Sequence, residues 1–338
     1  MQQTPPLSPQ AIWETMTGFQ RSEAFKAAVE LDVFTNVGAD GATADELAAA
    51  CACAPRGIRI LCDALTVMGF LAKRENRYSL TDQSAAFLDR RSPMFIGSAV
   101  EFMMSPVQKR GFEDLANAVR QGGSTVTDHG SLEPESPMWE SFAHSMVGLM
   151  IPSAEMIADR LGFDRERPLR VLDLAAGHGI FGITIARRYP HAEIYPLDWA
   201  NVLPAAVENA AKFGVGDRCH PIAGSAFEVD FGGDYDVVLA TNFLHHFDPP
   251  TNETLLRKIH RALKPDGRLM TLEFIPNEDR VSPAPAALFG LVMLAATPAG
   301  DAYTLAELKQ MLEAAGFKQN EYFPLDPTPQ QLVVSTKQ

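Results

Sequence analysis

The spacing of apolar positions predicts a long helical segment near the start of the chain. Between residues 10 and 35, apolar side chains recur every three to four positions, which is the period of a helix with one buried face. The residues that carry this pattern are Ile12, Met16, Phe19, Phe25, Ala28 and Val29.

A compact unit with helix start signals and a hairpin pattern follows. Thr43 with Glu46 three positions later matches a capping box, and Pro55 suits the first turn of the next helix. Two short strands, 70–73 and 78–80, flank a turn at Glu75–Asn76. Helix, helix and hairpin in this order predict a winged-helix fold.

The pattern changes twice further along the chain. Residues 90–165 read as mostly helical and are rich in Met and aromatic residues. From residue 167 on, apolar strands alternate with amphipathic helices, which predicts an α/β domain with a Rossmann-like, mostly parallel sheet. The segments KQNEYFPL and QQLVVST at the end predict a closing antiparallel pair.

Composition narrows the function classes. The 338 residues suit two domains, and a net charge of −13 makes nucleic acid a poor partner. No apolar run reaches the ~18 residues of a membrane span, and the start MQQTPPLSPQ lacks the pattern of a secretory signal, so we expect a cytoplasmic protein. The four cysteines form no C-x-x-C pair and the histidines have no metal-ligand spacing, so no metal site is expected.

A glycine-rich loop follows the first strand of the α/β domain. Gly177–Gly182 matches G-x-G-x-x-G, and Asp198 lies about 20 residues further on, as in dinucleotide-binding proteins. An NAD-dependent oxidoreductase is therefore one interpretation. Asp173 favours another, because a carboxylate at this strand end would repel a pyrophosphate but suits the ammonium and sulfonium end of S-adenosylmethionine (SAM).

The segment D-x-A-x-G-x-G resembles the D/E-x-G-x-G-x-G motif of class I methyltransferases, with Ala175 in place of the first glycine. Asp198 is expected to accept hydrogen bonds from ribose hydroxyls, and Trp199 to lie against adenine; a packing residue at a helix start is the alternative interpretation of Trp199. Lys264–Leu269 resembles the L-K-P-G-G-x-L turn of these enzymes. The expected cofactor-binding set is Asp173, Ala175, Gly177, Gly179, Asp198, Trp199, Ser225, Ala226, Phe227 and Asn242, where Ser225 replaces the family's Asp.

From about residue 10 onwards the chain resembles the small-molecule O-methyltransferases, which include caffeate-type, acetylserotonin-type and bacterial natural-product enzymes. The resemblance implies a winged-helix dimerisation domain at 1–100, a helical linker and substrate-pocket segment at 101–165, and a SAM-binding catalytic domain at 166–338. It also implies a homodimer formed through the N-terminal domain, and S-adenosylhomocysteine as product.

The segment Phe243–Phe247 occupies the place of the family's L-H-D-W sequence, with His246 in place of Asp. By this resemblance His245 is the catalytic base and Glu273 orients it. The chemistry agrees, since a neutral imidazole can take the proton of a phenol, whose pKa is about 10. In the family's G-x-E-R-T segment this chain has Gly300–Thr304, with Ala302 at the acidic position. A C- or N-methyltransferase therefore stays open.

The acceptor pocket is expected between the segment 100–150 and the catalytic domain, and Met and aromatic side chains favour an aromatic or polycyclic acceptor. The expected substrate-binding residues are Met103, Phe142, Met146, Phe243, His246, Phe289 and Met293. A DNA-binding regulator with SAM as effector is a third interpretation. Its recognition helix would be apolar, with only Arg56 and Arg59 as basic residues, which argues against it.

Overall fold

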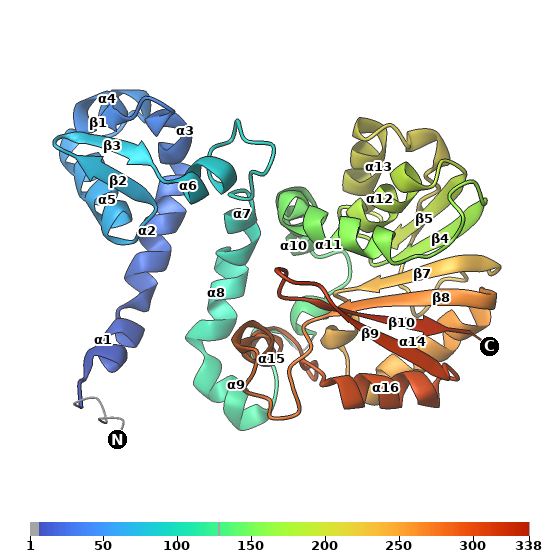
Figure 1. The fold of residues 1–338 in the computed structure, drawn as a ribbon. Coiled ribbons are helices and arrows are strands. Elements are labelled where there is room, and N and C mark those ends of the chain that lie inside the picture. Colours follow the sequence, from blue (N-terminus) through green and yellow to red (C-terminus); the bar gives the residue numbers. More distant parts are fainter. Residues whose placement is uncertain (1–6, 128, 338) are drawn as a thin grey trace, which may run out of the picture. The chain divides into compact units, whose positions relative to one another are not determined.

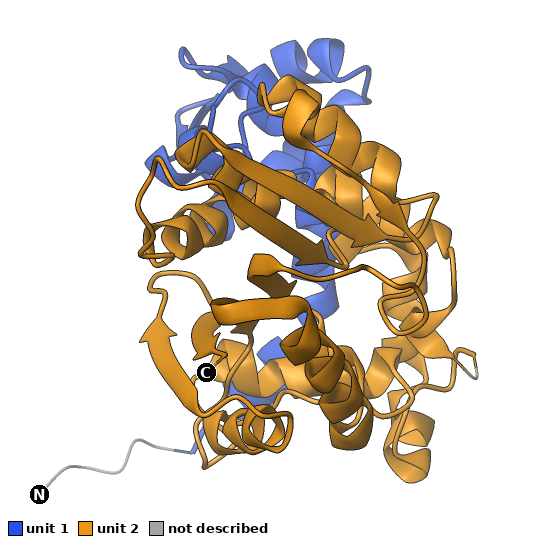
Figure 2. Ribbon diagram, turned by 90° about the vertical axis from the view of Figure 1, so that its right-hand side faces the viewer, with its two compact units in different colours: residues 1–100 blue, residues 101–338 orange. Residues whose placement is uncertain are grey.

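The computed structural model describes residues 7–127 and 129–337. Within these ranges no helix combines the length and the apolar character that a bilayer crossing needs. The chain divides into two compact units, coloured separately in Figure 2: unit 1 comprises residues 1–100 and unit 2 residues 101–338.

Unit 1 packs short helices against a small antiparallel sheet with the strand order β1-β3-β2. The capping box of Thr43 and Glu46 is present, and the predicted hairpin forms. The predicted helix over 10–35 is divided into three helices, and Asp32, with φ +55°, interrupts the helical conformation between the second and the third. The elements are α1 (Gln10–Met16), α2 (Gly18–Glu30), α3 (Val33–Val37), β1 (Ala42–Thr43), α4 (Ala44–Ala50), α5 (Pro55–Val67), β2 (Leu71–Arg74), β3 (Arg77–Leu80), α6 (Asp82–Phe87) and the start of α7.

Unit 2 begins with a helical segment, as the sequence predicts. Its elements are α7 (Ala99–Met103), α8 (Pro106–Glu113), α9 (Leu115–Gln121), η1 (Gly130–Leu132), α10 (Pro137–Ser145) and α11 (Val147–Asp159). In Figure 1 these helices run from cyan to green.

A seven-stranded sheet forms the rest of unit 2, with the order β6-β5-β4-β7-β8-β10-β9. The pairs among β4 to β8 are parallel, and β10 is antiparallel to both neighbours. This confirms the predicted α/β class and the antiparallel last strand. The elements are β4 (Leu169–Leu174), α12 (Ile180–Arg188), β5 (Ala192–Asp198), α13 (Leu203–Lys212), η2 (Gly216–Arg218), β6 (Ile222–Ala223), β7 (Tyr235–Thr241), η3 (Leu244–His246), α14 (Pro249–Ala262), β8 (Leu263–Glu273), α15 (Ala284–Ala296), α16 (Leu305–Ala314), β9 (Gln319–Pro324) and β10 (Gln331–Thr336).

The order of the strands fixes where a ligand can bind. The chain passes from β4 to β5 on one side, and later adds β7 on the other side of β4. Such a switch point opens a crevice at the carboxyl ends of the strands. The ends of β4, β5, β7 and β8 are therefore the first places to look for a site.

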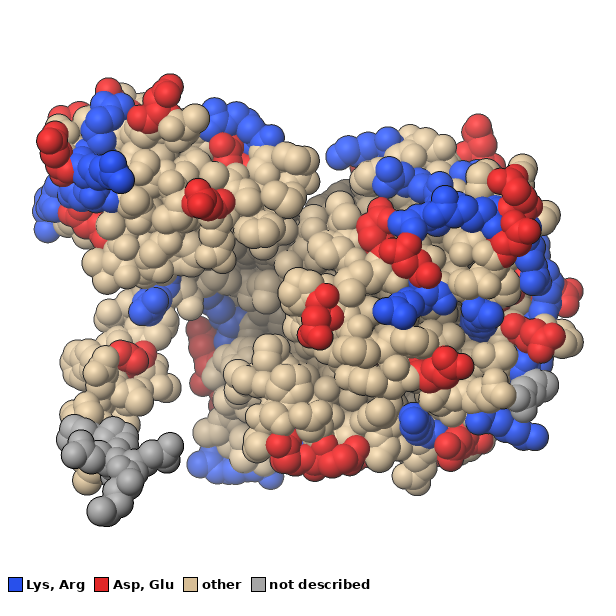
Figure 3. All heavy atoms as spheres, in the orientation of Figure 1, with Lys and Arg blue, Asp and Glu red and all other residues tan. Residues whose placement is uncertain are grey.

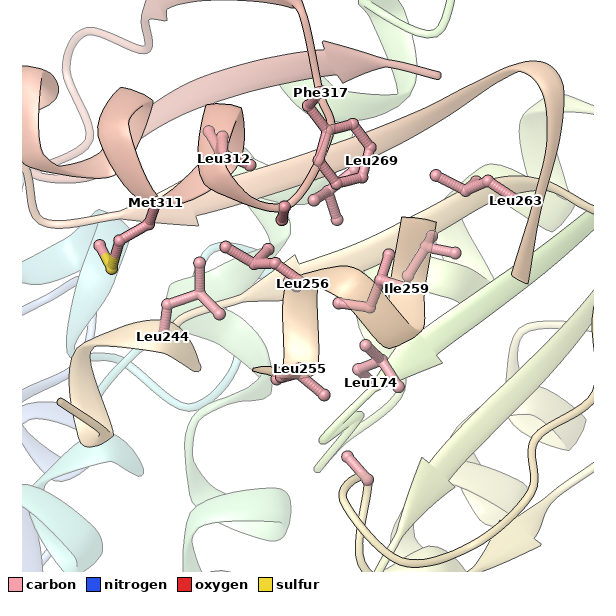
Figure 4. Packing of buried hydrophobic residues seen from close by; sticks show 14 of the residues in the cluster. Leu174, Leu244, Leu255, Leu256, Ile259, Leu263, Leu269, Met311, Leu312 and Phe317 are labelled. Atoms are coloured by element: carbon pink, nitrogen blue, oxygen red, sulfur yellow. The ribbon is translucent and has the colours of Figure 1, made fainter. Parts of the chain in front are cut away.

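The hydrophobic core of unit 2 fills the space between the sheet and the helices α14 and α16. Figure 4 shows Leu174, Leu256, Ile259 and Leu312 meeting in this layer. Complete burial of each such side chain contributes roughly 1.5–3 kcal/mol. Because side chains alternate along a strand, Leu174 points into this core while Asp173 belongs to the opposite face, which α12 covers.

The sequence pattern missed one helix. The Pro–Ala run over 281–288 carries no helical period, but α15 begins within it. Pro285 lies in the first turn of α15, where a missing N–H does no harm, so the prolines allow the helix to start.

Charged side chains of both signs are interspersed on the face of unit 2 that Figure 3 shows. Two helices of unit 2 are also linked by ion pairs, which Arg188 of α12 forms with Glu155 and Asp159 of α11.

Candidate active site

The loop between β4 and α12 turns sharply at three left-handed positions. The φ angles of Ala175, Gly177 and Gly179 are +50°, +53° and +71°. A Cβ on Gly179 would lie 2.9 Å from the Cβ of Ala206, so this glycine lets the loop pack against α13. Ala175 holds the same kind of conformation with a side chain, which costs roughly 1–2 kcal/mol.

Several backbone amides of this loop are already engaged within the protein. Ala176 donates to the carbonyl of Leu197, and Gly179 to that of Ala176. Gly177 donates to the carboxylate of Asp198 at 2.7 Å. A pyrophosphate needs such N–H groups free, so the loop is poorly suited to a dinucleotide.

Asp198 lies at the end of β5, as expected, and holds the loop. Its Oδ2 accepts from Gly177 and its Oδ1 from the amide of Trp199 at 2.7 Å, which leaves further lone pairs for hydroxyl donors. Burial raises the pKa of Asp198 to about 6. The amide of Gly224 donates to the carbonyl of Asp198, which brings Ser225 and its neighbours next to this strand end.

The other expected cofactor residues have specific packing partners. Trp199 packs beside a small cluster that includes Ala143 and Val202. Ala226 is buried, and Phe227 lies against Phe247 with ring centroids 4.9 Å apart.

Asp173 lies near the end of β4 with its carboxyl group buried inside the protein. Its carboxyl group is 1% exposed, and its Oδ2 accepts from the amide of Gly182 in α12 at 3.0 Å. Its Oδ1 is buried and has no hydrogen-bond partner among the described residues, and Asp173 lines a small cavity together with Pro196 and Cys219. Burial, more than the nearby Asp198, raises the pKa of Asp173 to about 7. Contact between Asp173 and the charged end of SAM stays a prediction.

This raised pKa makes the stability of the protein depend on pH. The folded state binds the proton of Asp173 more tightly than the unfolded state, whose pKa is near 3.8. The stabilisation is therefore complete below pH 4 and is lost as pH rises through about 7. Between pH 5 and 8 we expect the wild type to lose about 1 kcal/mol or more of unfolding free energy relative to Asp173→Asn. The Tm of the wild type should therefore fall by several degrees relative to that of the variant. Calorimetric scans of both proteins check this, and a constant difference in Tm would contradict it.

A histidine and a carboxylate meet at the ends of β7 and β8. His245 lies in η3 and Glu273 is the last residue of β8, and both are almost fully buried. The His245 Nδ1 is 2.5 Å from the Glu273 Oε2. Because an ionised carboxylate only accepts hydrogen bonds, Nδ1 carries the proton, and in the neutral ring Nε2 is left as a proton acceptor.

Glu273 also fixes the turn that carries this histidine. Its Oε1 accepts from the amides of Phe243 and Leu244 at 3.0 and 2.8 Å. From the other side, the buried Asn252 donates to the carbonyls of Leu244 and Phe247 at 2.8 and 3.1 Å. The position of the imidazole is therefore determined by hydrogen bonds from two elements.

The segment 300–304 lies against the same turn but adds no second carboxylate. The amide of Asp301 donates to the carbonyl of His245 at 3.0 Å. The side chain of Asp301 instead pairs with Arg280, and Ala302 is buried. Within the described residues, Glu273 is thus the carboxylate that hydrogen-bonds His245.

Aromatic rings connect the glycine loop with the histidine turn. The ring of Phe142 stacks on that of His178, with ring centroids 5.6 Å apart, and meets the Trp139 ring at a centroid distance of 5.8 Å. Trp139 meets His246 edge-on at 5.4 Å, and His246 lies 4.4 Å from His245. Burial and the adjacent His245 lower the pKa of His246, so its ring is neutral.

The structure brings only part of the expected acceptor pocket together. Phe289 lies 4.8 Å from His245, and Met146 and Met293 are buried. Met103, by contrast, is 59% exposed, and Phe243 packs on the core cluster.

Four residues near the site were not singled out from the sequence. His178 and Trp139 take part in the ring contacts above, and Asn252 supports the turn. Tyr303 donates its hydroxyl to the carbonyl of Phe247 at 2.5 Å. Tyr303 binds a carbonyl 56 positions earlier in the chain, which leaves no local pattern to recognise. Asn252 binds carbonyls eight and five positions earlier, across a turn whose shape the sequence pattern does not give.

Comparison with known proteins assigns the chain to a family. The model of the O-methyltransferase domain matches residues 140–318, and that of the O-methyltransferase dimerisation domain matches residues 13–90. The chain belongs to the O-methyltransferase family. This membership decides between the two interpretations of the glycine motif in favour of SAM.

Two curated relatives of this O-methyltransferase come from Streptomyces. The 3-hydroxy-5-methyl-1-naphthoate 3-O-methyltransferase of Streptomyces sahachiroi is 29% identical, over 93% of this chain and 91% of the relative. The tetracenomycin polyketide synthesis 8-O-methyl transferase of Streptomyces glaucescens is 28% identical, over 91% of each.

Solved structures agree in fold. A protein of Nostoc punctiforme described as an O-methyltransferase is 48% identical, with a TM-score of 0.93 over 98% of this chain and 100% of that one. Human N-acetylserotonin methyltransferase in complex with SAM has a TM-score of 0.85 at 22% identity, covering 100% of this chain and 99% of the human one.

The residues present fit SAM as the cofactor of this O-methyltransferase. Asp198 has spare lone pairs for hydroxyl groups, and the Oδ1 of Asn242 is a buried acceptor with no partner in the described chain. Asn242 is held at φ +53° beside β8 by a hydrogen bond from its amide to the carbonyl of Leu272. An acceptor-rich site of this kind suits a ligand with hydroxyl, ammonium and sulfonium groups.

Proposed function

We propose that this protein transfers the methyl group of SAM to a hydroxyl group of a small aromatic or polycyclic molecule. The observation that supports this most strongly is the buried contact between His245 and Glu273. It fixes the tautomer of the imidazole and leaves Nε2 able to take a proton, which methylation of a hydroxyl requires.

When bound, SAM would supply an electrophilic methyl group, with the carbon–sulfur bonding pair passing to sulfur as the acceptor oxygen bonds to the methyl carbon. His245 Nε2 takes the hydroxyl proton in the same step, so the charge of the substrate oxygen never builds up fully. Glu273 stabilises the imidazolium through Nδ1 and keeps the ring in place. Asn252 and the amide of Asp301 hold the backbone of the turn.

We assign the cofactor to the crevice at the ends of β4, β5 and β7. The loop of Ala175, Gly177 and Gly179 allows close approach of the ligand, and Asp198 receives the ribose hydroxyls. Trp199, Ser225, Ala226 and Phe227 surround the adenine side, and Asn242 faces the amino-acid side.

An aromatic acceptor is supported by the rings around the histidine. Trp139, His246, His245 and Phe289 form a row of ring contacts, with successive ring centroids 5.4, 4.4 and 4.8 Å apart. The name of the Streptomyces sahachiroi relative gives a naphthoate, which is a fused aromatic molecule, and that of the Streptomyces glaucescens relative refers to the synthesis of a polyketide.

Methylation of carbon is the second candidate. The acidic position of the family is Ala302 here, so a single carboxylate supports the base. One relative, 26% identical over 98% of this chain, is the L-tyrosine C(3)-methyltransferase of Streptomyces lavendulae. The position of the new methyl group in the product distinguishes the two candidates.

Calorimetric titration tests the first half of the proposal. We expect S-adenosylhomocysteine and SAM to bind with a stoichiometry of one per chain, and NAD to give no binding heat. A panel of hydroxylated aromatic and polycyclic molecules, incubated with SAM and read by mass spectrometry, then identifies the acceptor. Binding of NAD in place of SAM would contradict the proposal.

Each part of the chain has a role in this proposed function. We propose that residues 1–100 form the winged-helix dimerisation domain, 101–165 a linker that lines the acceptor pocket, and 166–338 the SAM-binding domain. We place the enzyme in the cytoplasm, because SAM is made and regenerated inside the cell.

Exposed apolar side chains of α1 and α2 provide a test of dimerisation. In the single chain, Trp13 and Phe19 are 64% and 65% exposed, and both lie within the matched dimerisation domain. We expect the double variant Trp13→Glu, Phe19→Glu to shift the dimer to monomer by about 10-fold or more in Kd, because charges cannot be buried unpaired. Light scattering after size exclusion measures the mass.

Val207→Glu, at an exposed apolar site of α13, is the control and should stay dimeric. A dimeric double variant would contradict the prediction.

A further inference from the structure

One buried polar group at the cofactor loop has no role in the mechanism above. His178 lies between Gly177 and Gly179 and is 2% exposed. Its Nδ1 accepts a hydrogen bond from the amide of Ile180 at 3.2 Å, while its Nε2 is buried without a partner within the described chain.

This geometry fixes the tautomer of His178. Because Nδ1 is an acceptor, the neutral ring must carry its proton on Nε2. Burial lowers the pKa of His178 to about 4, so the ring stays neutral under physiological conditions. The loop therefore contains a buried N–H donor that is unpaired, and leaving such a donor without an acceptor is costly.

The described residues contain no acceptor for this N–H, so a ligand bound at the loop is the group that would supply one. The amides of Gly177, Gly179 and Ile180 are engaged within the protein, so they are not free to bind an anion. The indole N–H of Trp139 donates to the carbonyl of Ser131 at 3.0 Å. The unpaired Oδ1 of Asn242 is an acceptor and suits an ammonium group rather than a carboxylate.

We infer that the Nε2–H of His178 is the hydrogen-bond donor for the carboxylate of the amino-acid end of SAM. This inference rests on the proposed function, because it takes SAM as the ligand of the loop. Phe142, stacked on the imidazole at 5.6 Å, keeps the ring in its orientation and shields the bond from water.

Two substitutions separate the two nitrogen atoms. The amide of asparagine reaches the place of Nδ1, so His178→Asn keeps an acceptor for Ile180 but loses the buried donor. The longer His178→Gln can place an N–H near Nε2. Calorimetry compares S-adenosylhomocysteine with its decarboxylated analogue, which keeps the ammonium and adenosine groups but lacks the carboxylate.

We expect His178→Asn to bind S-adenosylhomocysteine about 10- to 100-fold more weakly, since hydrogen bonds to charged groups are strong, and the analogue within about twofold of the wild type. His178→Gln should recover part of the loss. As a control, Asn242→Gly, which tolerates the φ of this position, should weaken both ligands alike.

Equal weakening of both ligands in His178→Asn, or no weakening, would overturn the inference while leaving the proposed function intact. A wild type that binds neither ligand would overturn the proposed function and this inference with it. Thermal unfolding of each variant shows whether the fold is kept.

Discussion

His245→Ala is expected to lower kcat by about 10²–10⁴-fold and to leave the Kd for S-adenosylhomocysteine near its wild-type value. The variant removes the atom that takes the hydroxyl proton, but none of the groups assigned to the cofactor. Initial rates with the acceptor found by screening, together with calorimetry, measure both quantities.

Glu273→Gln sharpens this experiment. A glutamine side chain can still accept at one atom, but it does not stabilise an imidazolium, so we expect a smaller loss of kcat than in His245→Ala. His220→Ala is the matched control, because His220 is a half-exposed surface histidine that pairs with Glu193. Unchanged turnover in His245→Ala would show that another group, or the solvent, takes the proton.

Gly300→Ala is expected to reduce kcat by roughly 10- to 100-fold through displacement of the histidine turn. A Cβ at Gly300 would overlap the carbonyl oxygen of His245, and would lie 2.7 Å from Thr297 Oγ1 and 2.9 Å from the carbonyl carbon of His246. The turn must move away, and overpacking of this kind destabilises a protein by about 1–3 kcal/mol. Rates and Tm are measured on the same preparation.

Gly57→Ala is the control for this substitution. Gly57 lies inside α5, and apart from its own helix backbone and chain neighbours no atom lies within 4 Å of the place that a Cβ would take, so alanine should raise helix stability slightly and leave kcat unchanged. Wild-type turnover and Tm in Gly300→Ala would contradict the close packing between this segment and His245.

The fold was predictable where the signal is local. The capping box of Thr43 and Glu46 and the apolar strand that ends at Leu174 are determined by neighbours in sequence. Helix α15 was missed because it is apolar on almost every side and so lacks an amphipathic period, and because its prolines read as loop residues.

The site was predictable only in part, for the same reason. His245 and Glu273 could be named from a motif, and they meet as expected. Asp173 could be named as well, but its side chain faces α12, because the alternation of β4 places it on that side of the sheet. The roles of Gly300 and His178 depend on contacts with His245 and Phe142, more than 30 residues away, which no local pattern contains.

The most direct test follows a labelled methyl group. The enzyme is incubated with SAM carrying a ¹³C-methyl group and with the acceptor identified by screening, and the product is analysed by NMR. We predict that the label appears as a methyl ether on a former hydroxyl oxygen, in amounts equal to the S-adenosylhomocysteine formed, and that His245→Ala gives almost none. A label on carbon or nitrogen with the hydroxyl intact, or no transfer to any acceptor while SAM is bound, would contradict the account.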